Sequence, residues 1–101
     1  DYNKIQSYGK TKEVLDLEPL KEKLDSFGYK VSEINGHCIN QLNKYFKRIK
    51  SNKEKPTALI CHTIKGKGFP FAENNPYWHH KNFFTEKETE DINQCLGTNK
   101  I

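Results

Sequence analysis

The feature that most constrains the fold is a short, almost continuously apolar run in the second half of the chain, from Pro56 to Thr63. The run is rich in aliphatic and β-branched residues and follows a polar stretch, so it predicts a β-strand. Near-continuous apolar strands of this kind are typical of buried parallel sheets whose faces are covered by helices. The run therefore favours an α/β fold.

Helical periodicity precedes this strand twice. Leucines and a phenylalanine at spacings of three and four predict an amphipathic helix over residues 17–27, with Pro19 in its first turn and Gly28 at its end. The same spacing predicts a second helix over residues 38–50. A short strand, residues 29–34, is expected between these helices, and residues 51–55 are expected to form a polar linker.

Both ends of the chain fit the same alternation. Residues 1–6 resemble the end of a strand that enters a polar turn, and this loop is expected to continue through Gly9 and Thr11. A long loop over residues 64–84 follows the apolar strand. Thr85 and Glu88 have the spacing of a capping box for a last helix, and Gly97 is expected to end it. The predicted fold class is α/β, a partial parallel sheet with flanking helices. Ligands of such sheets bind beyond the carboxyl ends of the strands.

The composition leaves little material for an independent core. Of 101 residues, 34% are hydrophobic and 30% charged, and the mean hydropathy is −0.94. Such a chain fits a piece of a larger protein, or a domain that buries its apolar faces on a partner. The alternative is a small, marginally stable soluble domain.

The net charge of +4 comes with a cluster of basic residues. Either a nucleic-acid-binding patch or a solvated helix face would give such a cluster. The run lacks the repeated Arg/aromatic interleaving of a stacking platform, which favours the solvated face. We expect no nucleic-acid partner. The cluster consists of Lys44, Lys47, Arg48, Lys50, Lys53 and Lys55.

The three cysteines, Cys38, Cys61 and Cys95, cannot all pair with one another, and none stands in a CxxC motif. Zinc binding through neighbouring Cys and His residues is an alternative, but structural zinc sites favour short spacings repeated twice. Buried cysteines beside strand ends are the favoured interpretation. No signal peptide and no membrane span are recognised, so we expect a cytoplasmic protein without a membrane partner.

The loop after the apolar strand carries residues suited to chemistry. Lys65 opens the run Lys65-Gly66-Lys67-Gly68, in which a lysine and flexible glycines suit a bound phosphate. His79, in Trp78-His79-His80-Lys81, supplies an imidazole for hydrogen bonding or proton transfer. For the glycine-rich run, the alternative is an ordinary mobile surface loop. For the aromatic residues Phe69, Phe71 and Trp78, the alternative is that they merely pin the loop to the sheet.

Asn3 and Ile5 form a second candidate pair. An asparagine side-chain oxygen and a main-chain carbonyl two residues later can face the same side of a turn. Hard oxygen ligands of this kind suit Mg²⁺. An asparagine that only forms the turn is the alternative.

Taken in order and spacing, several segments resemble transketolase, in the latter part of its thiamine-diphosphate-binding domain and especially in its compact and split-subunit forms. The resemblance covers residues 1–101, which would then be a partial thiamine-diphosphate-binding domain. The segments are Asp1-Tyr2-Asn3-Lys4-Ile5-Gln6, Phe27-Gly28-Tyr29, Asn35-Gly36-His37, Thr63-Ile64-Lys65-Gly66-Lys67-Gly68 and Glu73-Asn74-Asn75-Pro76-Tyr77-Trp78-His79-His80-Lys81.

The resemblance implies roles for individual residues. Asn3 would hold the divalent cation, Mg²⁺ or another such as Ca²⁺, through its side chain, and Ile5 would do so through its carbonyl. Lys65 would bind the diphosphate of thiamine diphosphate. His79 would contact the diphosphate region and the substrate during proton transfers, which makes it the expected catalytic residue. Asn3 and His79 would thus join Lys65 in binding the cofactor.

The activity implied is that of a transketolase-like transferase, which moves a two-carbon ketol unit from a ketose phosphate to an aldose phosphate in the pentose phosphate pathway of carbohydrate metabolism. Its partners would be sugar phosphates and the remaining transketolase domains or a second subunit. The complete enzyme would be a homodimer.

Departures from the family pattern leave a second hypothesis open. His80 replaces a glycine, Asn35 and Cys38 stand where an Asp-Gly-His-Asp pattern is common, and the glycine-aspartate-glycine metal motif is expected upstream of Asp1. By itself the chain is expected to be inactive. The alternative function is a non-catalytic fragment or remnant of such a domain, acting as a structural or interaction piece.

Overall fold

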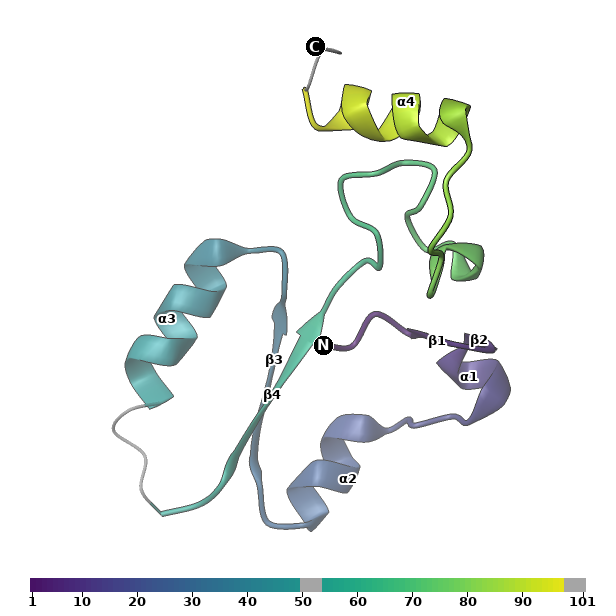
Figure 1. The fold of residues 1–101 in the computed structure, drawn as a ribbon. Coiled ribbons are helices and arrows are strands. Elements are labelled where there is room, and N and C mark those ends of the chain that lie inside the picture. The colour runs from purple at the N-terminus through teal and green to yellow at the C-terminus, as the bar shows by residue number, and fades with distance from the viewer. Residues whose placement is uncertain (50–53, 98–101) are drawn as a thin grey trace.

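The structure is a computed structural model that describes residues 1–49 and 54–97. At its centre two parallel strands pair, β3 (Lys30–Asn35) and β4 (Thr57–His62), in a register that runs from Lys30 opposite Thr57 to Asn35 opposite His62 (Figure 1). β4 is the predicted apolar strand, and Ile60 near its middle is buried. The fold class is α/β, with a small parallel sheet and flanking helices, as predicted.

The N-terminal segment extends this sheet by a single residue. Tyr2 forms a parallel bridge with His62, and its backbone N–H donates to the Cys61 carbonyl at 2.8 Å. Because β3 occupies one edge of β4, Tyr2 lies against the other edge, at the carboxyl end of the strand. The prediction that residues 1–6 leave a strand and enter a turn is confirmed for Tyr2 to Lys4, whereas Ile5 and Gln6 form a strand of their own. Three chain segments thus end next to one another at the carboxyl end of the sheet.

Helices α2 (Leu20–Ser26) and α3 (Ile39–Ile49) flank the two strands (Figure 1). α2 is shorter than predicted. Leu17 lies before its first residue and Phe27 after its last, and 77% of the Phe27 surface is exposed. Gly28, at a φ of +87°, lies just past the helix as expected. α3 agrees with its prediction up to Ile49. Lys50, Lys53 and most of the predicted linker lie outside the described residues.

A small unit after Tyr2 was not predicted. Strands β1 (Ile5–Gln6) and β2 (Gly9–Lys10) form an antiparallel hairpin, and helix α1 (Thr11–Val14) follows directly. The sequence indicated only a polar loop here. Strands of two residues and a single helical turn are too short to show a periodicity, which explains the omission.

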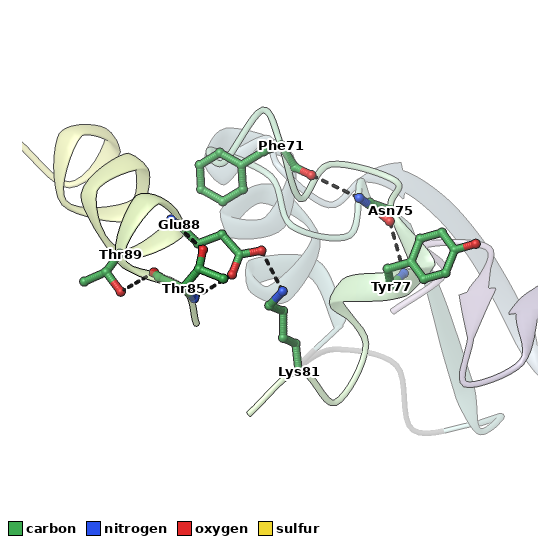
Figure 2. Close-up of polar contacts among 7 residues, drawn as sticks. All are labelled: Phe71, Asn75, Tyr77, Lys81, Thr85, Glu88 and Thr89. Atoms are coloured by element: carbon green, nitrogen blue, oxygen red, sulfur yellow. Dashed lines mark hydrogen bonds and ion pairs between the residues drawn. The ribbon is translucent and has the colours of Figure 1, made fainter. Parts of the chain in front are cut away.

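The last helix, α4 (Glu86–Cys95), begins with the predicted capping box. The Thr85 hydroxyl oxygen accepts from the Glu88 N–H at 3.2 Å, while the Glu88 carboxylate accepts from the Thr85 N–H at 2.9 Å (Figure 2). Gly97 follows the helix with a φ of +66°, as expected. Cys95 lies exposed on this helix, so the prediction of a buried cysteine is wrong there; Cys38 and Cys61 are half-buried.

The described residues bury very little apolar surface. Ile60 and Ala72 are the only buried hydrophobic side chains among them. The radius of gyration is 17.5 Å, whereas a compact chain of this length has about 13 Å. No helix within residues 1–49 and 54–97 is both long and apolar enough to cross a membrane. The small buried apolar surface and the large radius of gyration favour the expectation that the chain covers its apolar faces with other parts of a larger protein. The most exposed large apolar side chains are those of Tyr8, Leu15, Phe27, Ile39, Tyr77 and Phe83.

The long loop between β4 and α4 turns back on itself at its first glycine. Gly66 has a φ of +75°, and a Cβ placed there would lie 2.5 Å from the Ala72 carbonyl oxygen. The close approach of these two backbone segments helps to bury Ala72. Gly68 also has a positive φ, +100°, but a Cβ there would meet nothing within 4 Å. The space around the two glycines therefore differs, although both have a left-handed backbone conformation.

The pair Gly66→Ala and Gly68→Ala separates these effects. Gly68→Ala is expected to destabilise the protein by about 1 kcal/mol through backbone strain alone. Gly66→Ala should cost roughly 2–4 kcal/mol, because the new methyl group also displaces the Ala72 backbone. Urea unfolding of the protein that carries this chain measures both changes. Equal midpoints for the two variants would contradict the close approach.

Candidate functional site

The residues predicted to bind a metal lie where the N-terminal segment leaves the sheet. The Asn3 side-chain Nδ2 donates to one Asp1 carboxylate oxygen at 3.1 Å, and the other Asp1 oxygen accepts from the Thr63 hydroxyl. The Asn3 Oδ1 accepts from the Ile5 N–H at 3.0 Å. Asp1 therefore ties the Asn3 amide to the end of β4 and sets which way its oxygen points.

The ladder of the hairpin indicates that Asn3 and Ile5 present oxygens to one side. The Thr11 N–H donates to the Lys4 carbonyl at 2.9 Å, so the neighbouring Ile5–Lys10 pair is the one without ladder hydrogen bonds. The N–H and C=O of one strand residue point to the same side, and the Ile5 N–H meets the Asn3 Oδ1. Its carbonyl thus faces the Asn3 side of the hairpin. The turn-forming role of Asn3 and its predicted ligand role are compatible, since Oδ1 has a second lone pair.

The backbone between these two residues is held in an unusual conformation. Lys4 has a φ of +65°, in the left-handed region that a long side chain seldom adopts. Its carbonyl accepts from both the backbone and the hydroxyl of Thr11, at 2.9 and 3.3 Å, which keeps it there. Strained residues of this kind gather at binding and active sites.

An open hollow of about 290 Å³ lies beside this turn. It joins the Asn3–Ile5 turn to the carboxyl end of β4, which is the edge at which α/β sheets bind ligands. Neither Lys65 nor His79 is part of its wall. The hollow is lined by Tyr2, Asn3, Lys4, Ile5, Lys10, His62, Thr63 and Asn74.

The two lysines of the glycine-rich run differ in their surroundings. The Lys67 ammonium lies 3.6 Å from the Glu73 carboxylate, which also accepts from the Gly68 N–H at 3.1 Å. This backbone hydrogen bond, with the charge of Lys67, lowers the pKa of Glu73. Lys65 is half-buried and forms no ion pair or side-chain hydrogen bond with the described residues. Lys65 is therefore the lysine of the run that is available for an external anion.

His79 connects the long loop to the N-terminal hairpin. Its Nε2 shares a hydrogen bond of 3.1 Å with the Ser7 hydroxyl, and its Nδ1 is buried without a partner among the described residues. Burial lowers the pKa of His79 most, and the charges of His80 and Lys65 lower it further. The structure thus brings Lys65 and His79 within electrostatic reach of each other and favours a neutral imidazole.

His80 occupies a position where the backbone suits glycine. Its φ is +58°, and its ring meets that of His79 edge-on, with 4.2 Å between the ring centroids. Histidine is among the residues that tolerate this region better than most. The replacement of the expected glycine therefore leaves the backbone turn intact and places an exposed imidazole against the candidate catalytic one.

Aromatic contacts fix the loop that carries these histidines. The Trp78 ring lies 5.0 Å from that of Phe71 and 5.8 Å from that of Phe84, measured between centroids. Figure 2 shows a second set of contacts, in which Lys81 pairs with Glu88 at 2.6 Å. Asn75 is the N-cap of the short 3₁₀ helix η1 (Pro76–Trp78), and its side chain accepts from the Tyr77 N–H. These rings pack on one another within residues 71–84, and the alternative that they pin the loop to the sheet stays a prediction.

Three residues of the site escaped the sequence analysis. Ser7 contacts His79 although 72 positions separate them in the sequence, and no local sequence pattern predicts such a contact. His37 accepts from the Ile64 N–H at 2.7 Å and fixes the start of the loop; its place in Asn35-Gly36-His37, after a strand, was the available signal. Gln6 has a buried side-chain nitrogen without a partner among the described residues.

Comparison with known proteins finds a family match that covers the whole chain. The family described as transketolase, thiamine diphosphate binding domain, matches residues 1–101. The chain is 39% identical over 80 residues to a subunit of the apulose-4-phosphate transketolase of Phocaeicola vulgatus, covering 79% of this chain and 28% of that protein. It is 41% identical over 73 residues to a 6-deoxy-6-sulfo-D-fructose transketolase subunit of a Clostridium species, covering 72% and 26%.

An animal relative is also similar. Transketolase-like protein 2 of Bos taurus is 33% identical over 72 residues, which are 71% of this chain and 12% of that protein. The chain thus spans no more than about a quarter of the length of the curated relatives it matches.

We expect His80→Gly to stabilise the protein by about 0.5–1 kcal/mol, because glycine adopts a positive φ without strain. The same change should raise the pKa of His79, since it removes a neighbouring imidazolium charge. Thermal unfolding and histidine NMR titration measure the two effects.

The pH dependence follows from the sign of this shift. The folded pKa of His79 lies below the unfolded value of about 6.5, so the unfolded chain binds the extra proton first as the pH falls. His79 therefore makes the protein less stable below about pH 6.5, and this loss should be smaller in His80→Gly. An unchanged His79 titration in the variant would contradict the contact between the two rings.

Proposed function

Because the chain belongs to the family of the transketolase thiamine diphosphate binding domain, we propose that it is part of an enzyme that transfers a two-carbon ketol unit from a ketose phosphate to an aldose phosphate. The observation that carries this proposal is the position of His79. It contacts Ser7 beside the candidate metal turn and lies within electrostatic reach of Lys65. The His79 imidazole thereby links the candidate metal turn, Asn3–Ile5, to the candidate diphosphate-binding residue, Lys65.

The residues present suit thiamine diphosphate and a divalent cation. Lys65 has an ammonium that is unpaired within the described residues and can meet a diphosphate. His79 Nδ1 and Gln6 Nε2 are buried polar atoms without partners in the described residues. Such atoms are costly unless something outside these residues satisfies them. A polar ligand and the rest of the protein are the two sources of such partners.

We assign the binding roles accordingly. The Asn3 side-chain oxygen and the Ile5 carbonyl would hold the cation, Mg²⁺ or another such as Ca²⁺, since both are hard oxygen ligands. Lys65 would bind the diphosphate as a point charge. His79 would contact the diphosphate region and the substrate. When bound, the cofactor supplies the stabilised carbanion that ketol transfer requires.

The chain's own residues contribute charge and proton handling. Lys65 stabilises negative charge close to His79. The lowered pKa of His79 keeps its imidazole neutral near pH 7, so one ring nitrogen donates and the other accepts a proton. A neutral histidine can donate its N–H to an oxygen of the ligand, while its other nitrogen can take up a proton and, once protonated, give it back.

The complete enzyme would need parts beyond this chain. We propose that the remaining transketolase domains, or a second subunit, complete the site, and that the whole enzyme is a homodimer acting on sugar phosphates in the pentose phosphate pathway. The split-subunit names of the similar proteins support the partner. We further propose a cytoplasmic location, because the three cysteines are free thiols.

A specific observation favours a second candidate function, that of a non-catalytic structural piece. His80 adds a bulky imidazole to the turn that carries His79, at a position where a smaller residue is expected. Kinetics of the complete enzyme distinguish the two functions, because a structural piece leaves turnover insensitive to His79.

In the complete enzyme, His79→Ala should lower kcat by about 100-fold or more, the usual contribution of a positioned acid–base group. The cause would be loss of proton transfer, so the melting temperature should change little. Lys87→Ala is a suitable control, because this side chain is exposed on α4, is polar and lies outside the site. A His79→Ala enzyme with the kinetics of the unmodified protein would reject the proposed catalytic role.

The two lysines of the loop offer a matched pair for cofactor binding. Lys65→Met should weaken thiamine diphosphate binding by about 10- to 100-fold, the value of one charge-assisted hydrogen bond. Lys67→Met should change it by less than about threefold, because Lys67 is already paired with Glu73. Calorimetric titration of the complete enzyme with thiamine diphosphate and Mg²⁺ measures both. Equal losses in the two variants would contradict the assignment to Lys65.

A further inference from the structure

The contact between Ser7 and His79 is the one side-chain hydrogen bond that joins the N-terminal hairpin to the histidine loop among the described residues. Ser7 lies in the turn between β1 and β2, and its hydroxyl has no other hydrogen bond within that part of the chain. The hydroxyl is therefore free to rotate toward the ring. Because a serine hydroxyl can donate or accept, the contact is compatible with either tautomer of a neutral His79, and the rest of the ring's surroundings decides between them.

We propose that Ser7 is a positioning residue that donates to His79 Nε2 and so places the imidazole proton on Nδ1, the buried nitrogen that has no partner among the described residues. This inference rests on the proposed function and extends it, because it assigns to Nδ1 the donor that a diphosphate or sugar oxygen would accept.

The surroundings of the ring favour this tautomer. Lys65 and His80, the charged or titratable groups that act on His79, are cationic when charged, and with burial they oppose a second proton on the ring. A neutral ring has a single N–H, and an anion-binding site gains only if that N–H points inward. The alternative tautomer would give the N–H to Ser7, an exposed residue that water can satisfy, and would leave a lone pair facing the anion.

A tautomer set by a hydroxyl has a chemical consequence. Removing the hydroxyl leaves Nε2 without a donor, and the ring then reverts to the Nε2–H form that predominates for histidine in water. With the wrong tautomer the ring presents a lone pair instead of an N–H to the bound oxygen, which lowers turnover although the residue itself remains in place. Ser7→Ala is therefore expected to reduce kcat by roughly 10- to 100-fold, with a much smaller change in KM.

The test uses the complete enzyme with ¹⁵N-labelled histidine rings, the His79 signals being assigned with His79→Gln. Two-bond nitrogen–proton correlations identify the tautomer without any need for activity. We expect the Nδ1–H form in the unmodified protein and in Ser7→Thr, which keeps the hydroxyl. We expect the Nε2–H form in Ser7→Ala. Ser26→Ala, which removes a hydroxyl that donates to the Lys23 carbonyl instead, should leave His79 unchanged.

The outcomes separate this inference from the proposed function. An Nε2–H signal in the unmodified protein, or the same tautomer in Ser7→Ala, would overturn the role of Ser7 even if the enzyme transfers ketol units. An Nδ1–H signal that is lost in Ser7→Ala would support it even if no ketol transfer is detected. A fall in kcat for Ser7→Ala that Ser7→Thr does not restore, with the tautomer unchanged, would also count against it.

Discussion

The parallel pairing of β4 with β3 on one side and with Tyr2 on the other is the interaction on which the rest of the structure depends. The carboxyl ends of parallel strands lie at the same end of a sheet. The segments that follow these strands therefore begin next to one another. The Asn3–Ile5 turn, the Asn35-Gly36-His37 turn and the Lys65 loop all start there. Hydrogen bonds from Thr63 to Asp1 and from Ile64 to His37 then tie the three segments together.

Close packing at this edge also explains why one of its turns needs glycine. A Cβ on Gly36 would lie 2.5 Å from the Thr63 Cγ2 and 3.0 Å from the Cys61 Cβ. The β3 turn therefore lies directly against the end of β4, and no side chain fits between them. The same contact keeps His37 within reach of the Ile64 N–H. The backbone of the Gly36 turn thus packs directly against the Thr63 and Cys61 side chains at the end of β4.

Much of this fold could be predicted from the sequence, because β4, α3 and α4 carry strong local signals. An apolar run, a helical period and a capping box each need only a few adjacent residues to be recognised. The hairpin and α1 could not be predicted, since they are too short to have a period. In the site, Asn3, Ile5, Lys65 and His79 came from motifs and resemblance. Ser7 could not, because its bond to His79 depends on how two distant loops meet.

The pairing of Glu73 with the glycine-rich run has a consequence for ligand binding. Its carboxylate holds the Gly68 N–H and the Lys67 ammonium, so the backbone of the loop has an internal counterion before any phosphate arrives. A loop fixed in this way does not have to be ordered by its ligand, and less of the interaction energy is lost as conformational entropy. The glycine-rich run is therefore ordered before any ligand binds, and the anion that its Gly68 N–H binds is one that the chain itself provides.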